Sequence, residues 1–318
     1  MRTSMALIIT LLLIKTSRAE EPRELQARGR LSFEEIDESS ALEISRRLPG
    51  VWWTLNDSGD EARLFAVDST GALIQPEWDK EYRGLLLPGA VNIDWEDLAQ
   101  DDRGNLIIGA FGNNGNARRD LAVYLLPEPN PRAVNAARPL KRIPFAWPDQ
   151  RDFPPAAANF DCEAVFFARG ALHFLTKHRA DRRTRLYRLD PFPFESLPPG
   201  QPWHAAFRED LVHPLTHLGT AEVGGLRPDI PGLVTAADAT PDGRWVAILT
   251  YTGVFVVDNG EASAADGTGD LLAGEWRWLP IAAGQCEGIA LDGESVWITN
   301  EQRDIFRVEF GDLVPFRP

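Results

Sequence analysis

Residues 286–308 read CEGIALDGESVWITNEQRDIFRV, and they hold three short apolar runs in succession. A small and acidic opening leads into a short apolar run, and the pair Asp292-Gly293 then supplies a tight turn. A second apolar run ends in Thr299-Asn300-Glu301, and a third occupies residues 304–308. Short apolar runs joined by Asp-Gly turns predict antiparallel β-strands.

The same order recurs along the chain in degenerate form, whereas helical periodicity is almost absent. Fourth strands are predicted at residues 140–146, 215–223 and 275–281. Four antiparallel strands repeated about an axis form a blade of a β-propeller. We therefore predict an all-β fold, a β-propeller of five blades. Six blades are the alternative, because residues 190–226 are long enough to hold part of another. The five openings are Glu38-Ser39-Ser40-Ala41-Leu42, Trp95-Glu96-Asp97-Leu98-Ala99, Cys162-Glu163-Ala164-Val165, Thr235-Ala236-Ala237-Asp238-Ala239 and Cys286-Glu287-Gly288-Ile289-Ala290.

The two ends of the chain complement each other. The last repeat ends near the C-terminus without a fourth strand, and residues 30–36 form a spare strand near the N-terminus. We expect this N-terminal strand to complete the final blade and close the ring. Residues 20–318 are then one propeller domain.

Residues 1–19 are predicted to be a signal peptide. Arg2 provides the positive start, residues 5–14 are a ten-residue apolar run, and Ala19 follows at the cleavage spacing. Ten residues are too few to span a bilayer. We expect a secreted protein, periplasmic or extracellular, that is monomeric and not embedded in a membrane.

The charge of the chain narrows the classes of partner. Cleavage after residue 19 removes Arg2, Lys15 and Arg18 and no acid, so the formal net charge changes from −14 to −17. Such an acidic protein is not expected to bind nucleic acid. A cation, a small polar molecule or a glycan fits better.

The repeat brings polar residues together. In a propeller the openings of the first strands and the ends of the second strands emerge on one face, so these residues should meet in a central funnel. The first-strand openings contribute Glu38, Asp94, Glu96, Asp97, Asp161, Glu163, Asp238 and Glu287. The second-strand ends contribute Asn56, Asp57, Asn113, Asn114, Lys177, Tyr251, Asn300 and Glu301.

So many carboxylates cannot all stay ionised and unpaired, and a bound cation relieves their repulsion. Carboxylate and amide oxygens are the hard ligands that Ca²⁺ prefers. We predict a Ca²⁺ site formed by some of five acids. The alternative is that these acids accept hydrogen bonds from backbone N–H groups of neighbouring blades and hold the blades together. The predicted ligands are Glu96, Asp97, Glu163, Asp238 and Glu287.

Other residues of the funnel are candidates for ligand contacts and catalysis. Lys177 and Tyr251 are expected to face an anion or hydroxyl of the ligand, and Trp95 to offer a ring platform. Residues 111–120 combine Gly, Asn and Arg, so Asn113, Asn114 and Arg118 are also candidates, although a structured turn with exposed arginines is the simpler interpretation. Glu301 completes the ligand set. The catalytic candidates are Glu163, Asp238 and Lys177.

Cys162 and Cys286 precede equivalent glutamates in two repeats. An exported chain meets an oxidising compartment, so a disulfide is favoured if the channel is narrow. Two buried thiols are the alternative.

Five motifs of the repeats stand out: Asp94-Trp95-Glu96-Asp97-Leu98-Ala99, Gly109-Ala110-Phe111-Gly112-Asn113-Asn114, Phe160-Asp161-Cys162-Glu163-Ala164, Phe174-Leu175-Thr176-Lys177 and Glu287-Gly288-Ile289. Together they resemble the motifs of a group of secreted bacterial β-propeller proteins of unsettled function. The resemblance spans most of residues 20–318. Members often carry Asp where Ala110 stands, so no ligand role transfers to that position. More distantly, the repeat is similar to esterase-like phytase and Ca²⁺-dependent lactonase propellers, a similarity of fold alone.

Three functions are compatible with these sequence features. The first is an exported propeller whose acidic funnel binds Ca²⁺ and a small polar ligand. The second is a Ca²⁺-dependent hydrolase of a phosphoester or lactone, with Glu163 or Asp238 as the base. The third is a structural or protein-binding propeller without metal. No Gly-x-Ser-x-Gly or His-Glu-x-x-His motif is present, which argues against serine hydrolases and zinc proteases.

Overall fold

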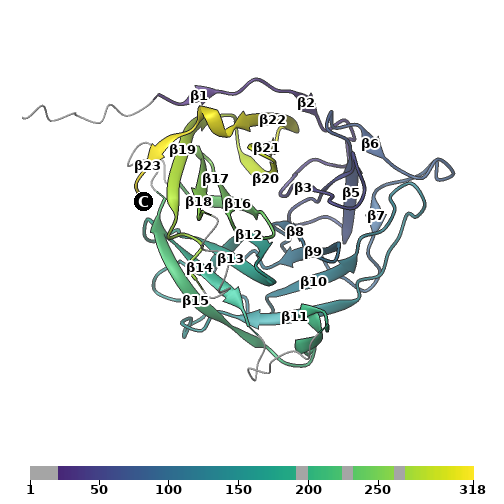
Figure 1. The fold of residues 1–318 in the computed structure, drawn as a ribbon. Helices are drawn as coiled ribbons and strands as arrows, with labels where there is room; N and C mark the ends of the chain where they lie inside the picture. The colour runs from purple at the N-terminus through teal and green to yellow at the C-terminus, as the bar shows by residue number, and fades with distance from the viewer. Residues whose placement is uncertain (1–20, 191–199, 224–231, 261–268) are drawn as a thin grey trace, which may run out of the picture.

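The computed structural model describes residues 21–190, 200–223, 232–260 and 269–318 (Figure 1). The predicted signal peptide lies outside the described residues. Within them the structure is almost entirely β, with short 3₁₀ turns such as η1 (Trp203–Ala206) and η3 (Phe310–Asp312). No helix in this part of the chain has the length and apolar character needed to cross a membrane.

The strands form successive antiparallel units that follow the predicted repeats. The first contains β3 (Glu43–Ile44), β4 (Trp52–Thr54), β5 (Arg63–Val67), β6 (Leu73–Ile74) and β7 (Leu85–Leu86). The second contains β8 (Leu98–Gln100), β9 (Asn105–Ala110), β10 (Ala122–Pro127) and β11 (Lys141–Ala146). The third contains β12 (Asp161–Ala168), β13 (Ala171–Lys177), β14 (Arg183–Leu189) and β15 (His213–Glu222). The fourth contains β16 (Val234–Ala239), β17 (Trp245–Thr250), β18 (Gly253–Asp258) and β19 (Glu275–Ala282).

The last unit closes the fold. It contains β20 (Cys286–Asp292), β21 (Ser295–Asn300) and β22 (Asp304–Glu309), and β2 (Gly29–Arg30) from the N-terminus pairs antiparallel with β22. The N-terminal strand therefore completes this unit, as predicted, although it is shorter than residues 30–36. At the outer edge, β1 (Arg23–Glu24) and β23 (Val314–Phe316) both pair with β19.

The innermost strands form a ring. Contacts run from β3 to β8, β12, β16, β20 and back to β3, and Figure 1 shows these strands around the centre of the molecule. The predicted β-propeller is confirmed. The choice between five and six blades stays a prediction, because residues 191–199 and 224–231 lie outside the described residues.

The core lies between neighbouring units rather than inside one. Each buried apolar cluster combines side chains from two adjacent units, for example Trp53 of β4 with Leu98 of β8. Strands buried on both faces explain the continuous apolar runs in the sequence. Trp52 and Trp53 are buried and Trp297 packs against the cluster that closes the ring, so these rings belong to the core between units.

His173 makes stability depend on pH. Its ring is 1% exposed and stacks on Phe166, with centroids 5.2 Å apart. Burial, reinforced by Arg188, lowers the pKa of His173 to about 3. The unfolded chain takes up this proton near pH 6.5, so the stabilising contribution is present above that pH and is lost as the pH falls toward 3. Between pH 7 and 5, we expect wild type to lose about 2 kcal/mol more than His173→Phe, measured by urea unfolding. Parallel pH profiles of the two proteins would contradict this assignment.

Candidate functional site: an acidic cluster at one end of the ring

A bulge at the start of three innermost strands leaves one residue each outside the regular pairing. The register shifts between Cys162 and Ala164, between Val234 and Ala236, and between Cys286 and Gly288. A bulge leaves its extra residue unpaired and turns its side chain away from the regular pleat. The equivalent bulge residues are Glu163, Thr235 and Glu287.

Six carboxylates from four units form what we call the acidic cluster. They lie just before or at the start of β8, β12 and β20, and just after β4. Their charges act on one another: Asp57 raises the pKa of both Glu96 and Glu287, and Asp161 raises that of Glu163. The predicted convergence of strand ends therefore brings these acids together. The members are Asp57, Asp94, Glu96, Asp161, Glu163 and Glu287.

Three of these acids approach each other most closely. One carboxylate oxygen each of Asp57, Asp94 and Glu96 lies within 4.8 Å of the other two. Burial and the neighbouring Asp57 raise the pKa of Asp94 to about 6, against the opposing charge of Arg118. The Arg118 guanidinium lies 3.9 Å from the Asp94 carboxylate. Asp57 and Asp94 were predicted to reach the funnel but were left out of the metal ligands.

No residue that the structure describes pairs with the charge of Glu96. The residue is 3% exposed, and among the residues that the structure describes no hydrogen-bond donor contacts its carboxylate. Burial and the charges of Glu163 and Asp57 raise its pKa well above the usual range. A buried carboxylate without a donor is energetically costly unless it is protonated or binds a cation.

Gly112 makes room for this group. A Cβ added at Gly112 would lie 2.0 Å from Glu96 Oε1 and 2.5 Å from Asp94 Cγ. Only glycine lets the loop after β9 approach both carboxylates so closely.

A chain of hydrogen bonds crosses the other side of the cluster. Lys177 Nζ lies 2.7 Å from Glu163 Oε2 and donates to the Tyr251 hydroxyl at 2.9 Å. That hydroxyl donates to Glu287 Oε1 at 3.3 Å. Burial alone lowers the pKa of Lys177, but Glu163 and Tyr251 outweigh it and raise the pKa, so the ammonium stays charged. Burial raises the pKa of Tyr251 to about 12, against Lys177.

Arg179 was missed by the sequence analysis. Its Nε lies 2.7 Å from Asp161 Oδ2, and its side chain is 30% exposed while that of Asp161 is fully buried. It also contacts the Asn114 side chain and lies 3.7 Å from Glu163 Oε1. Its position two residues after Lys177, on the same side of an extended chain, was the signal that could have identified it.

The remaining predicted ligand residues, Asn113, Asn114 and Glu301, differ in their exposure to solvent. Asn113 is buried and its side chain accepts the backbone N–H of Arg118 at 2.9 Å, so it shapes the loop. Asn114 is exposed. Glu301 is half-buried and is held by the side chain of Gln285, which also donates to Glu287 at 3.1 Å.

Asp97 fits the alternative interpretation, a contact that holds units together. Its carboxylate is fully buried and accepts backbone N–H bonds from Leu98 at 2.8 Å, Val165 at 2.9 Å and Ala237 at 3.4 Å. These three donors belong to β8, β12 and β16. With its lone pairs engaged by the backbone, Asp97 is not among the three closely grouped acids.

Asp238 was predicted to be a metal ligand of the funnel, but it does not belong to the acidic cluster. Thr235 is the bulge residue of its unit, and Asp238 lies three residues farther along β16. Asp238 lies four residues beyond Val234 along β16, about 13 Å at strand spacing. It accepts N–H bonds from Ala239 at 2.7 Å and Leu291 at 2.8 Å, and it lines a separate cavity with Glu43 and Arg46.

Two further expectations are corrected. The Trp95 ring is fully buried and its Nε1 donates to Val91 O at 3.1 Å, so it offers no platform to a ligand. Cys162 and Cys286 are free buried thiols rather than a disulfide. They pack in different apolar clusters, between different pairs of units, which is why equivalent positions in the repeat do not bring them together.

Comparisons with known proteins were made at three levels. No protein-family model matches the chain, and no curated protein matches it. A solved putative gluconolactonase is 10% identical, with 90% of this chain and 77% of that chain covered and a TM-score of 0.42. A gluconolactonase from Xanthomonas campestris is 12% identical, with 92% and 95% covered and a TM-score of 0.41. An inactive virginiamycin B lyase from Staphylococcus aureus is 13% identical, with 85% and 66% covered and a TM-score of 0.38. Similarities this low carry no argument about function.

Proposed function

We propose that the protein binds a divalent cation, Ca²⁺ by the chemistry of its ligands, at Asp57, Asp94 and Glu96, together with a small polar ligand. The observation that carries this proposal is the buried Glu96 carboxylate, which lies with two other carboxylates within 4.8 Å and has no donor among the described residues. A divalent cation at this point relieves the repulsion among three like charges.

The ligand set favours Ca²⁺ over other metals. The three side chains offer hard carboxylate oxygens, and no imidazole or thiol belongs to the group. Ca²⁺ accepts six to eight oxygens in flexible geometry, whereas Mg²⁺ demands a near-ideal octahedron. Of the five acids predicted as metal ligands, Glu96 belongs to this group of three. The group does not include Glu163 and Glu287, whose oxygens are engaged by Lys177, Tyr251 and Gln285.

The cationic residues beside this group suit a polar ligand with an anionic or hydroxyl group. Arg179 is the accessible cation of the site, with 30% of its side chain exposed, and Asn114 beside it is exposed as well. A small polar molecule or a glycan is the proposed partner. Export through the N-terminal signal peptide, a periplasmic or extracellular location and a monomeric state complete the proposal.

Ca²⁺ is expected to raise the melting temperature. A ligand at 100 times its Kd adds about 2.7 kcal/mol, which corresponds to roughly 5 °C for a domain of this size. We expect this rise on adding Ca²⁺ to EDTA-treated wild-type protein, and no rise for Glu96→Gln. Without metal, Glu96→Gln should melt above wild type, because it removes one of the repelling charges.

The control is Glu77→Gln, which removes the same charge at an exposed position. It should respond to Ca²⁺ as wild type does. If wild type shows no Ca²⁺-dependent change, the acids serve to hold the blades together and the propeller is structural or protein-binding.

Gly112→Ala tests the same site from the backbone. Because the new Cβ would lie 2.0 Å from Glu96 Oε1, the carboxylate must move, and we expect Ca²⁺ affinity to fall about 10-fold or more. Gly115→Ala is the matched control, since nothing lies within 4 Å of its added Cβ. Calorimetric titration of both variants checks this; equal affinities would place the cation elsewhere.

A Ca²⁺-dependent hydrolase of a phosphoester or lactone is the second candidate. The observation that favours it is the charged Lys177, which is held against both Glu163 and the half-buried Tyr251 hydroxyl beside the proposed cation site. Such a chain can hold or move a proton while the metal polarises a substrate oxygen.

Asp238 is no longer a candidate base. Ca²⁺-dependent turnover of p-nitrophenyl phosphate or a γ-lactone, lost in Glu163→Gln, is the expected result for this candidate. Binding without turnover leaves the first function.

A further inference from the structure

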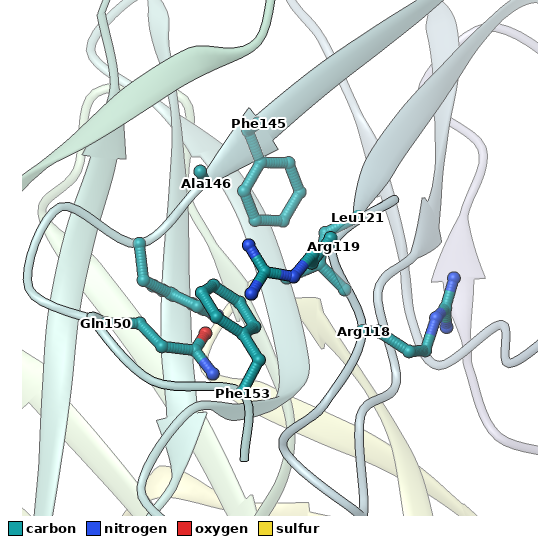
Figure 2. A pocket seen from close by; sticks show the side chains of 8 residues that line it. Arg118, Arg119, Leu121, Phe145, Ala146, Gln150 and Phe153 are labelled. Atoms are coloured by element: carbon teal, nitrogen blue, oxygen red, sulfur yellow. The ribbon is translucent and has the colours of Figure 1, made fainter. Parts of the chain in front are cut away.

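A small aromatic cavity lies beside the acidic cluster on the second unit. Its volume is about 160 Å³, and its apolar walls come from the start of β10, the end of β11 and the segment after β11 (Figure 2). The lining residues used below are Arg119, Leu121, Phe145, Trp147, Gln150 and Phe153.

The size and walls of this cavity fit one six-membered ring. A cavity of about 150 Å³ with apolar walls is known to bind benzene. Three of the lining residues here, Phe145, Trp147 and Phe153, are aromatic, and aromatic side chains hold a flat guest by offset or edge-to-face contacts.

Arg119 adds a positive charge to the wall of the cavity. Its guanidinium carbon lies 3.8 Å from the centroid of the Phe153 ring, and Figure 2 shows the group turned toward the cavity, whereas Arg118 points away from it. Among the described residues no carboxylate forms a salt bridge with Arg119, and the residue is exposed.

Two lining side chains carry a polar atom for which no described residue is a hydrogen-bond partner. Trp147 is 4% exposed, and its Nε1–H is buried without a hydrogen-bond acceptor. Gln150 is 8% exposed and uses its amide nitrogen on Asn116 O at 2.8 Å, while its Oε1 accepts no hydrogen bond from the described residues. A guest that carries both a donor and an acceptor would satisfy these groups.

We propose that this cavity binds a single-ring aromatic carboxylate. The ring enters between Phe145, Trp147 and Phe153, the carboxylate pairs with the Arg119 guanidinium, and a ring hydroxyl reaches Trp147 or Gln150. The proposal does not depend on the cation site. Arg118 lines the same cavity and lies 3.9 Å from Asp94, so a guest here would sit next to that site.

The test is a calorimetric titration with 4-hydroxybenzoate, and with 4-hydroxybenzamide as its neutral counterpart, in the presence of EDTA. We expect the acid to bind about 10-fold or more tightly than the amide, because a hydrogen bond to a charged group contributes more than a neutral one. Arg119→Gln should reduce the affinity for the acid to that for the amide and leave the amide unchanged.

Two further variants complete the experiment. Arg132→Gln removes an exposed arginine on another loop and should bind the acid as wild type does. Ala146→Trp, at a half-buried lining position, should fill the cavity and abolish binding of both compounds while the circular dichroism spectrum stays unchanged. Equal affinity for acid and amide, or binding that survives both Arg119→Gln and Ala146→Trp, would overturn the proposal. Because EDTA is present throughout, failure of the cation site leaves this result unaffected.

Discussion

Replacing Asp97 by alanine is expected to lower the free energy of unfolding by about 3–5 kcal/mol. The carboxylate is fully buried and accepts close N–H bonds from Leu98 and Val165, with Ala237 slightly farther away. Alanine leaves these buried donors unpaired, and each unpaired buried donor costs about 1–3 kcal/mol. Because the donors lie on three different innermost strands, the substitution should weaken the contacts between three neighbouring units.

Urea unfolding of the purified variant measures this loss. Asp102→Ala, at an exposed turn position between β8 and β9, is the control and should stay within about 0.5 kcal/mol of wild type. A change in Asp97→Ala no larger than in the control would show that the units are held together without this carboxylate. Asp97 would then return to the candidate metal ligands.

Replacing Lys177 by methionine is expected to destabilise the protein by about 3–5 kcal/mol. The Lys177 side chain is 4% exposed and its ammonium is 2.7 Å from Glu163. Methionine preserves much of the volume but leaves Glu163 buried among like charges, with Arg179 at 3.7 Å as its remaining cation. Removing one partner of a buried ion pair costs more than removing both.

The double variant Lys177→Met with Glu163→Gln provides the control. We expect it to recover a large part of the lost stability, because the unpaired charge is gone. Denaturant unfolding of wild type, both single variants and the double variant gives the coupling between the two residues. If the single and double variants are equally unstable, the loss comes from packing and not from the ion pair.

Most of the fold follows from local patterns in the sequence. Strand β11 (Lys141–Ala146) falls within the predicted residues 140–146, and β22 (Asp304–Glu309) covers the predicted residues 304–308. The apolar residues of these segments are buried because neighbouring units stack on one another. The pairing of β2 with β22 was predicted from the missing strand alone.

The details of the site were harder to predict, because they depend on register. Within a strand, a bulge shifts every later side chain by one place, and no local pattern marks it. Glu163 and Glu287 were aligned correctly because each follows a cysteine. The opening of the fourth unit has no such marker, so its acid, Asp238, was predicted to join them although Thr235 holds the equivalent position.

The group of Asp57, Asp94 and Glu96 was also hard to predict, because its members are far apart in the sequence. Asp57 was predicted to reach the funnel but not to bind the metal, because its approach to Asp94 and Glu96 joins two different units. Trp95 shows the converse: its acidic neighbours suggested a surface residue, yet alternation along the extended chain turns its ring into the core. The resemblance to secreted bacterial propellers stays a prediction.

The central claim is that Asp57, Asp94 and Glu96 together bind one divalent cation. The most direct test is calorimetric titration of Ca²⁺ into EDTA-stripped, desalted wild-type protein and into Glu96→Gln. We expect one saturable Ca²⁺ site in wild type, weaker binding of Mg²⁺, and no detectable Ca²⁺ binding in a folded Glu96→Gln variant. Saturable binding that is unchanged in Glu96→Gln, or no binding at all to wild type, would contradict it.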